Sequence, residues 1–326
     1  MIEGARGGVA PRRCFRRRRC CVVKPLVDAL ARRAKLPAAT NCFRWSDEDL
    51  PGVTVDLFDD VAVLSLYRDA PDEAAIADAI APHVRAVYVK RRPREARKVA
   101  NESPEQLAPP MPLRGDAVEA LIVEEQGAKF EIRPGNGLSV GLYLDARDAR
   151  SWVRDNARER TVLNTFSYTC GFGVLARLGG ARRAVNIDAS RKVLDWGEKN
   201  LALNGFEADR YDFISGDTFD WLSRFAKKAE VFDLIVLDPP GFATTKTSRF
   251  TAQRDYHQLV AAAEKVLAKN GVLLAMCNVE QLSVRDFTQL VQRGFGSRKF
   301  KVRESFGASA VDFKQPSTLK CLVVDA

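Results

Sequence analysis

The stretch from Thr161 to Asp188 constrains the fold of this chain more than any other. It begins with an apolar run that suits a buried strand, passes through a turn carrying Gly171 and Gly173 into a helix of small residues, and ends in a second apolar run closed by Asp188. A strand, a glycine turn, a helix and a second strand with a terminal carboxylate form half of a nucleotide-binding α/β unit. The glycines let the backbone approach a ligand closely, and the carboxylate is placed to accept hydrogen bonds from two ribose hydroxyls.

The spacing of these glycines differs from a dinucleotide fingerprint. Gly173 is followed by Val174, Leu175 and Ala176, so the third glycine of G-x-G-x-x-G is absent. A turn with fewer glycines suits an adenosine ligand without a pyrophosphate, such as S-adenosylmethionine. The alternative on this stretch alone is an ordinary α/β unit whose glycines only make a tight turn.

The composition is that of a globular protein with room for two domains. The 326 residues are 46% apolar and 29% charged. No uninterrupted apolar run approaches the ~20 residues of a membrane span. The seven cysteines form no CxxC pair and there are only two histidines, so the sequence predicts no metal site. We interpret the chain as a cytoplasmic protein with reduced thiols.

The net charge of +9 belongs to the N-terminal arm. Residues 1–36 contain eleven Lys and Arg against Glu3 and Asp28, which is 11 − 2 = +9, and the remaining residues carry 40 charges of each sign. Residues 1–22 lack periodicity, so we expect this basic arm to be partly disordered. It either binds RNA phosphates or is upstream sequence of little consequence.

Residues 37–118 are expected to form a smaller α+β domain of an RNA-binding type. Their pattern predicts a hairpin over 53–57 and 61–67, a helix over 72–82 and a strand over 86–90. The strand runs into a basic segment that contains one acid, Glu95, among Lys90, Arg91, Arg92, Arg94, Arg97 and Lys98. This segment is the best candidate for phosphate contacts, with a solvated surface loop as the alternative. The Pro-rich residues 101–118 mark a domain boundary.

Residues 119–326 alternate apolar strands with helices, which predicts a mostly parallel sheet covered on both faces. Ligands of such sheets bind outside the carboxyl ends of the strands. Asp188, Asp217, Asp238 and Cys277 all fall at such ends. The sequence therefore predicts a Rossmann-like α/β domain with a seven-stranded sheet and one ligand-binding edge.

The segment Asp238-Pro239-Pro240-Gly241-Phe242 is the most informative short motif. Two prolines fix φ at consecutive residues and remove two N–H donors, so a rigid turn presents a carboxylate and backbone carbonyls toward a planar amide or amine. Phe242 is placed to stack on an unpaired base. The alternative is a structural proline turn after a core strand.

Several ordered motifs together resemble the class I S-adenosylmethionine-dependent methyltransferases that modify large-subunit ribosomal RNA. They are GLYLDARDAR (141–150), NTFSYTCGFGVLA (164–176), VNIDAS (185–190), GD (216–217) and DLIVLDPPGF (233–242). The similarity starts near residue 36, because FRWSDEDLPGVTVDLFDD (43–60) resembles the domain that precedes catalysis in that family. The family's N-terminal PUA domain is missing, and only the basic arm precedes residue 36.

The resemblance implies a role for each matching residue. The methionine end of S-adenosyl-L-methionine would be lined by Asn164, Phe166, Ser167 and Gly171. Asp188 would hold the ribose, and Asp217 the adenine amine beside Thr218. Asp238 would contact the cofactor and face the reactive centre. Asp145 and Arg147 match the family's LDxR segment, with Ala146 where glutamine is usual.

The target base depends on Cys277 and Asn278. Family members that make 5-methylcytosine carry a nucleophilic cysteine at the position of Asn278, whereas relatives that methylate guanine N7 carry asparagine there. The N7-type relatives also have a QRD segment and a late DF pair, matched here by Gln253-Arg254-Asp255 and Asp312-Phe313.

The resemblance therefore implies methylation of guanine N7 in large-subunit ribosomal RNA. The catalytic set would be Asp238, Pro239, Pro240, Phe242 and Asn278, with Asp238 and Asn278 holding the base edge. The alternatives are cytosine-C5 methylation with Cys277 as the nucleophile, a methyltransferase for small molecules or proteins, and a non-catalytic RNA-binding protein.

Overall fold

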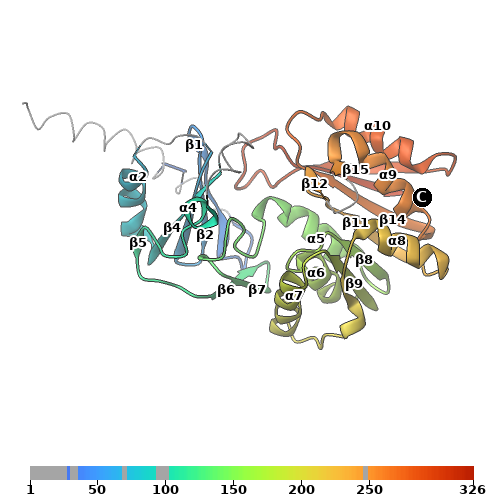
Figure 1. Ribbon diagram of the computed structural model, residues 1–326, viewed down its shortest axis with the longest axis horizontal. Coiled ribbons are helices and arrows are strands. Elements are labelled where there is room, and N and C mark those ends of the chain that lie inside the picture. The colour runs from blue at the N-terminus through green and yellow to red at the C-terminus, as the bar shows by residue number, and fades with distance from the viewer. Residues whose placement is uncertain (1–27, 30–35, 68–71, 93–102, 245–248) are drawn as a thin grey trace, which may run out of the picture. The chain divides into compact units, whose positions relative to one another are not determined.

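The structure is a computed structural model that describes residues 28–29, 36–67, 72–92, 103–244 and 249–326. It divides into two compact units (Figure 1). The first comprises residues 1–36, 43–119 and 134–138, and the second comprises residues 37–42, 120–133 and 139–326. Most of the basic arm expected over residues 1–36 lies outside the described residues, as do Arg94, Arg97 and Lys98.

The first unit is built on a five-stranded sheet with the order β1-β2-β3-β4-β5. Its strands are Cys42–Leu50 (β1), Val53–Phe58 (β2), Val61–Leu66 (β3), Ala86–Arg91 (β4) and Arg114–Gly115 (β5). The predicted hairpin is confirmed, because β2 and β3 pair antiparallel across a turn in which Asp59 has a φ of 53°. The predicted helix is also present as α2 (Glu73–Ile80), followed by η1 (Ala81–His83); α4 (Pro104–Leu107) was not predicted.

Two short segments belong to a different unit from the one that the sequence suggested. Residues 37–42 join the second unit because they run along β6 (Leu121–Glu125), where the Asn41 N–H donates to the Glu124 carbonyl at 3.0 Å. Residues 134–138 join the first unit, where Gly135 lies so close to Pro110 that a Cβ would stand 2.6 Å from its carbonyl oxygen.

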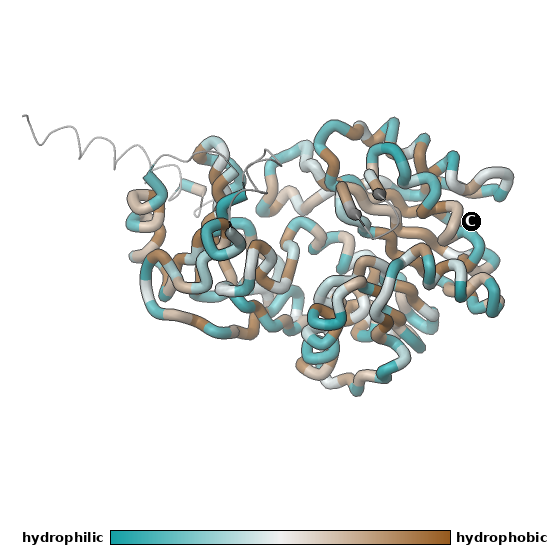
Figure 2. Tube along the Cα trace, viewed as in Figure 1, coloured by the Kyte–Doolittle hydropathy of each residue, from teal (hydrophilic) through white to brown (hydrophobic). Residues whose placement is uncertain are grey.

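The second unit contains the seven-stranded sheet that the sequence predicted, with the order β10-β9-β8-β11-β14-β16-β15. Its strands are Thr161–Thr165 (β8), Arg183–Asp188 (β9), Phe213–Ser215 (β10), Phe232–Leu237 (β11), Leu267–Cys277 (β14), Lys301–Phe306 (β15) and Lys320–Asp325 (β16). The first five run parallel, and β16 is antiparallel to both of its neighbours. Figure 2 shows hydrophobic residues along these strands, as expected for a sheet covered on both faces.

Helices cover both faces of this sheet (Figure 1). One face packs against α8 (Thr218–Lys227), α9 (Ala252–Glu264) and α10 (Val284–Phe295) in a single apolar core. The helices α6 (Gly171–Leu178) and α7 (Arg191–Leu203) contact β8, β9 and β10, and α5 (Arg147–Asn156) packs on α6. Gly173 lies against Asn186, whose side chain points to the face opposite Val185 and Ile187.

The remaining elements are short. They are the hairpin of β6 with β7 (Ala128–Ile132), the pair β12 (Phe242–Thr244) and β13 (Arg249–Thr251), and the turns η2 (Leu144–Ala146) and η3 (Arg210–Asp212). The helix α9 ends at Glu264, shortly before β14 begins at Leu267. None of the helices in the described ranges is long and apolar enough to cross a membrane.

Candidate active site

Five parallel strands of the second unit end along one edge, and polar residues follow each end. In spatial order, β10 leads to Asp217, β9 ends at Asp188, β8 leads to Ser167, β11 leads to Asp238 and β14 leads to Asn278. Parallel strands present their carboxyl ends on the same side. The predicted site residues, which span more than a hundred positions in the sequence, therefore share one edge of one sheet.

The turn from β8 to α6 has an unusual backbone. Phe166, Tyr168 and Cys170 have φ values of 53°, 48° and 61°, in the left-handed region that favours glycine. The Ser167 N–H donates to the Ile187 carbonyl at 2.9 Å and fixes the turn to β9. Such strain persists where the surrounding structure imposes it and is common at ligand-binding sites.

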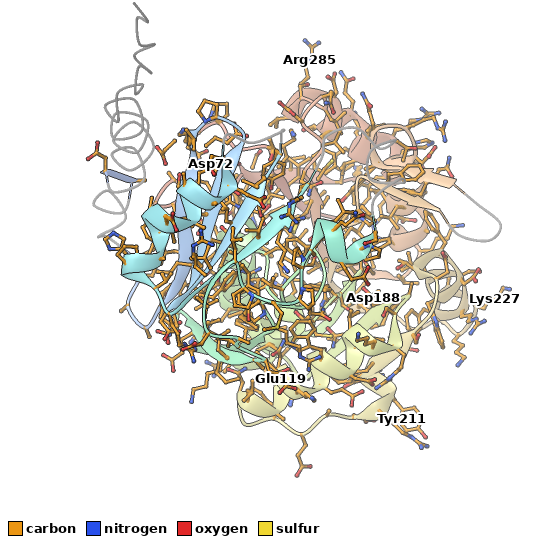
Figure 3. All side chains as sticks on the ribbon, turned by 60° about the vertical axis from the view of Figure 1, so that its left-hand side comes forward. Asp72, Glu119, Asp188, Tyr211, Lys227 and Arg285 are labelled. Atoms are coloured by element: carbon orange, nitrogen blue, oxygen red, sulfur yellow. The ribbon has the colours of Figure 1, made fainter. Side chains whose placement is uncertain are left out.

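Asp188 connects this turn to the start of α7 (Figure 3). Its Oδ2 accepts the Tyr168 N–H and its Oδ1 accepts the Ser190 N–H, both at 2.9 Å. Burial raises the pKa of Asp188, and these two hydrogen bonds oppose the rise. Each carboxylate oxygen keeps a further lone pair, as binding of a vicinal diol requires.

Asp217 is the N-cap of α8. Its Oδ1 accepts the N–H groups of Phe219 at 2.8 Å and Asp220 at 3.2 Å, while Oδ2 accepts no hydrogen bond within the part of the chain that the structure describes. Thr218 is buried in the first turn of this helix. The carboxylate is thus held rigidly, and its second oxygen is the one that remains for a ligand amine.

Asn164 is fully buried within β8. Its Nδ2 donates to Asn186 Oδ1 at 2.9 Å, and in the described part of the chain its own Oδ1 has no hydrogen-bond partner. A buried carbonyl without a donor is costly and calls for an explanation, such as a donor supplied by a ligand.

Asp238 directly follows β11 and is only partly exposed. Burial and the nearby carboxylate of Asp145 raise its pKa to about 7, and the Arg150 guanidinium opposes the rise. Two carboxylates close together in a partly dry site disfavour their joint ionisation and favour a cationic ligand. This acidic pair lies next to Pro239, which is buried, and Phe242, which is 51% exposed.

Cys277 and Asn278 differ sharply in environment. Cys277 is 1% exposed and its thiol belongs to the apolar core under α9 and α10. Burial is the main cause that raises its pKa, so the thiol is not activated as a nucleophile. Asn278 is exposed, beside a loop that Lys320 holds by donating from Nζ to the Val279 carbonyl at 2.7 Å.

Tyr256 supports the ends of β11 and β14 and was not found by sequence reasoning. Its hydroxyl, fully buried, donates to the Leu237 carbonyl and accepts the Met276 N–H, each at 3.0 Å. The residues that follow these two are Asp238 and Cys277. The only signal in the sequence is a tyrosine on the apolar face of the 252–264 helix, which periodicity alone assigns to the core.

The matched QRD and LDxR segments have structural partners. Arg254 pairs with Asp255 at 2.9 Å, and Asp255 Oδ2 accepts the Thr251 N–H at the start of α9. Arg147 is fully buried, with Nη1 3.0 Å from Asp312 and Nη2 donating to the Cys42 carbonyl at 2.7 Å. The guanidinium of Arg147 is therefore occupied within the protein.

A buried ion network surrounds Arg147. Glu125 lies 3.4 Å from Arg147 and accepts from Arg150 at 2.7 and 2.8 Å. With Asp312, the network contains two cations and two anions, so its charges balance. It joins α5 to the β6–β7 hairpin and to the segment before β16, and thereby holds η2, which carries Asp145. In the described residues, no three His, Cys, Asp or Glu side chains gather in a way that could hold a metal ion.

Known proteins resemble this chain in sequence and in structure. Residues 44–324 match the family described as S-adenosylmethionine-dependent methyltransferase. Ribosomal RNA large subunit methyltransferase I of Aeromonas salmonicida (strain A449) is 36% identical over 249 residues, 76% of this chain and 62% of that protein. Ribosomal RNA large subunit methyltransferase K/L of Psychrobacter arcticus is 31% identical over 305 residues, 84% of this chain and 38% of that protein.

Among solved structures, SMU.776 in complex with SAH has the same fold. The TM-score is 0.84 at 23% identity, over 98% of this chain and 83% of that one. This chain thus spans less than two thirds of the length of each of the two curated relatives. The fold of SMU.776 matches nearly the whole of this chain.

Proposed function

This chain belongs to the S-adenosylmethionine-dependent methyltransferase family, and we propose that it transfers a methyl group from S-adenosylmethionine to guanine N7 of large-subunit ribosomal RNA. The cofactor assignment rests on the set of carboxylates at one edge of the sheet. Asp188 has lone pairs left for ribose hydroxyls, and Asp145 with Asp238 forms an acidic pair that a sulfonium cation would relieve. The large-subunit rRNA names of the relatives favour RNA as the substrate class.

The choice of N7 rests on the environment of Cys277. Methylation at cytosine C5 needs a thiolate that adds to the base, and a thiol buried in the apolar core with a raised pKa is poorly suited to it. Guanine N7 carries an available lone pair, so no covalent nucleophile is required. Asn278 is exposed at the adjacent strand end and suits a hydrogen bond to the base edge.

Each proposed residue then has a defined task. The bound cofactor supplies an activated methyl group on a sulfonium. Asp188 holds the ribose, the free oxygen of Asp217 accepts from the adenine amine, and Phe242 stacks on the base. Asp238 and Asn278 orient the base so that N7 points along the bond to the methyl group, and the Asp238 carboxylate stabilises the positive charge that develops on guanine.

The test is mass spectrometry of nucleosides from ribosomal RNA incubated with the purified protein and S-adenosylmethionine. We expect 7-methylguanosine from the wild type and from Cys277→Ala. Formation of 5-methylcytidine that disappears in Cys277→Ala would establish the cytosine reaction instead.

The cofactor assignment is tested separately by calorimetry. Asp188→Ala should weaken S-adenosylmethionine binding about 10- to 100-fold, because hydrogen bonds to a charged group contribute about 1.5–3 kcal/mol. Asp188→Asn checks folding, since its remaining oxygen still accepts a backbone N–H. Asp195→Ala, an exposed carboxylate on α7, is the matched control and should leave binding unchanged. Equal affinity in Asp188→Ala and the control would remove Asp188 from the site.

A further inference from the structure

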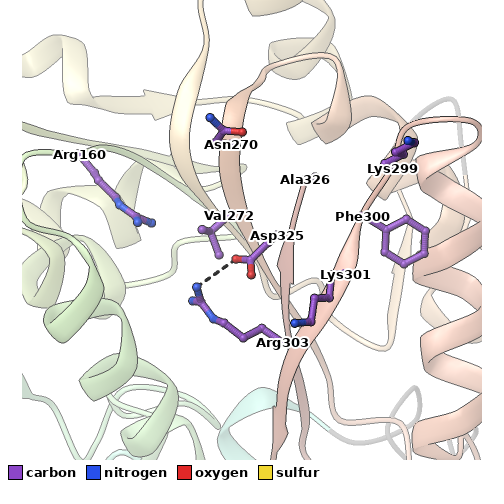
Figure 4. A pocket seen from close by; sticks show the side chains of 9 residues that line it. All are labelled: Arg160, Asn270, Val272, Lys299, Phe300, Lys301, Arg303, Asp325 and Ala326. Atoms are coloured by element: carbon purple, nitrogen blue, oxygen red, sulfur yellow. Dashed lines mark ion pairs between the residues drawn. The ribbon is translucent and has the colours of Figure 1, made fainter.

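An open pocket of about 470 Å³ lies in the second unit, at the opposite ends of the strands from the carboxylate edge (Figure 4). It is lined by the residue before β8, Arg160, by the start of β15, and by Val272 of β14 and Asp325 of β16. On β14, Val272 precedes Cys277 by five residues, which is about 17 Å of strand. The pocket is therefore separate from the proposed methyl-transfer site.

The lining of this pocket is strongly cationic. It contains Arg160, Lys299, Lys301 and Arg303 against the single acid Asp325. Asp325 already pairs with Arg303 at 3.1 Å. For Arg160, Lys299 and Lys301, no ion pair is found among the described residues. The chain outside the N-terminal arm has equal numbers of acids and bases, so this pocket is a local excess of positive charge, as is the basic segment at 90–98.

The positions of these cations are set by the backbone of β15 and of the segment before it. Lys301 lies opposite Asp325 in the β15–β16 ladder, and an irregularity between Val302 and Glu304 sets Arg303 out of register. Arg298 anchors the preceding segment by donating to the Ala268 carbonyl at 2.8 Å. In Figure 4 the guanidinium groups of Arg160, the residue before β8, and of Arg303 on β15 reach into the pocket.

Arg160 provides an independent sign of a missing partner. Its Nη1 is buried, and no hydrogen-bond partner for it exists in the part of the chain that the structure describes. A buried guanidinium N–H without an acceptor costs free energy that an anion in the pocket would recover.

We propose that this pocket binds the phosphate backbone of the RNA substrate at a point remote from the methylated base, an inference that rests on the proposed function. A volume of about 470 Å³ open to solvent exceeds what one phosphate ion fills. Lys299 and Lys301, just before and at the start of β15, are two residues apart, about 7 Å of extended chain, which suits a chain with repeated charges better than a single ion. Phosphates on these lysines and on Arg160 would fix the register of a large RNA without reading its sequence.

The experiment compares two double variants with the same change in charge. Lys299→Glu/Lys301→Glu alters the pocket, and Lys227→Glu/Lys228→Glu alters exposed lysines at the end of α8. Binding of a fluorescently labelled large-subunit rRNA transcript is measured by anisotropy over a series of salt concentrations. The pocket variant should bind at least about tenfold more weakly than the control, and its slope of log K against log salt should fall by about 1.4, or 0.7 for each lost phosphate contact. S-adenosylmethionine affinity should be the same in both.

Equal RNA affinities and slopes in the two variants would overturn the proposal. A second outcome would show that the pocket binds a small anion instead of RNA. In that case inorganic phosphate would raise the Tm of the wild type but not of the pocket variant, while the pocket and control variants bound RNA equally well. Failure of the proposed function has a different signature, because the wild type itself would then form no methylated nucleoside.

Discussion

Replacing Asp238 by asparagine should stabilise the protein while abolishing methyl transfer. The carboxyl has a pKa of about 7 in the folded protein against an ordinary value of 3.8, because burial and the neighbouring Asp145 disfavour its charge. Below pH 3.8 the group is protonated in both states and has no effect. Between pH 3.8 and 7 only the unfolded state loses its proton, so stability falls as the pH rises, and above pH 7 the loss is constant.

The magnitude follows from the same pKa values. A difference between 3.8 and about 7 corresponds to about 4 kcal/mol at pH 8. Asp238 is partly exposed, so water screens part of this cost and we expect Asp238→Asn to recover about half, or about 2 kcal/mol. For 326 residues with an unfolding entropy of about 2.1 cal/mol/K each, that is a rise in Tm of about 3 °C. The rise should shrink toward zero as the pH is lowered to 4.5.

Thermal unfolding of the wild type and Asp238→Asn between pH 4.5 and 8.5 provides the measurement. Asp145→Asn is the companion variant, because removal of the second carboxylate should lower the pKa of Asp238 and move the pH dependence to lower pH. A difference in Tm between Asp238→Asn and the wild type that does not change with pH would refute the reasoning, since uncharged effects of the substitution have no such dependence.

Two further substitutions test other parts of the framework. Lys90 on β4 is fully buried, its Nζ has no hydrogen-bond partner among the described residues, and burial followed by the charge of Arg92 lowers its pKa to about 8. Its protonated form is thus disfavoured in the folded protein, so stability is lost as the pH falls from 10.5 to about 8. Lys90→Met should therefore stabilise the protein at pH 7 by up to about 3 kcal/mol, measured by urea unfolding. A loss of stability in this variant would contradict the reasoning. Tyr256→Phe should lower the free energy of unfolding by about 1–3 kcal/mol, because the Leu237 carbonyl and the Met276 N–H lose their shared hydroxyl. The substitution should also lower turnover more than S-adenosylmethionine affinity. Unchanged stability would exclude the bridging role.

The strand ends could be predicted from the sequence because each apolar run stops at a polar residue. Asp188, Asp217 and Asp238 follow strands whose sequence is apolar on both faces, so the pattern identifies a parallel sheet and its ligand edge together. Local capping was less certain. Ser190 is the N-cap of α7, a residue type that favours this position, but its side chain makes no capping bond and its N–H instead donates to Asp188.

The buried ion network could not be predicted, because its members come from distant segments. Glu125, Arg147 and Asp312 have no shared periodicity, and the match of Arg147 to a family segment gave no sign of a salt bridge. The basic run after β4 shows the same limit. Arg91 pairs with Glu73 at 2.6 Å and Arg92 donates to the Leu138 carbonyl, so two expected phosphate ligands already have partners within the protein.

The uncompensated charges that remain are informative because they are costly. Asp238 lies beside Asp145 and its pKa stays raised despite the nearby Arg150, and among the described residues Arg160 has a buried N–H without an acceptor, whereas the paired charges around Arg147 balance. These two sites lie at opposite ends of the same strands and therefore predict ligands of opposite sign; Lys90, buried in the first unit without a partner among the described residues, is a further unbalanced charge. A sulfonium at the carboxyl ends and RNA phosphate at the amino ends would satisfy both. The two can be separated experimentally, because S-adenosylmethionine should lower the pKa of Asp238 and weaken its pH dependence without changing the salt dependence that Lys299 and Lys301 give to RNA binding.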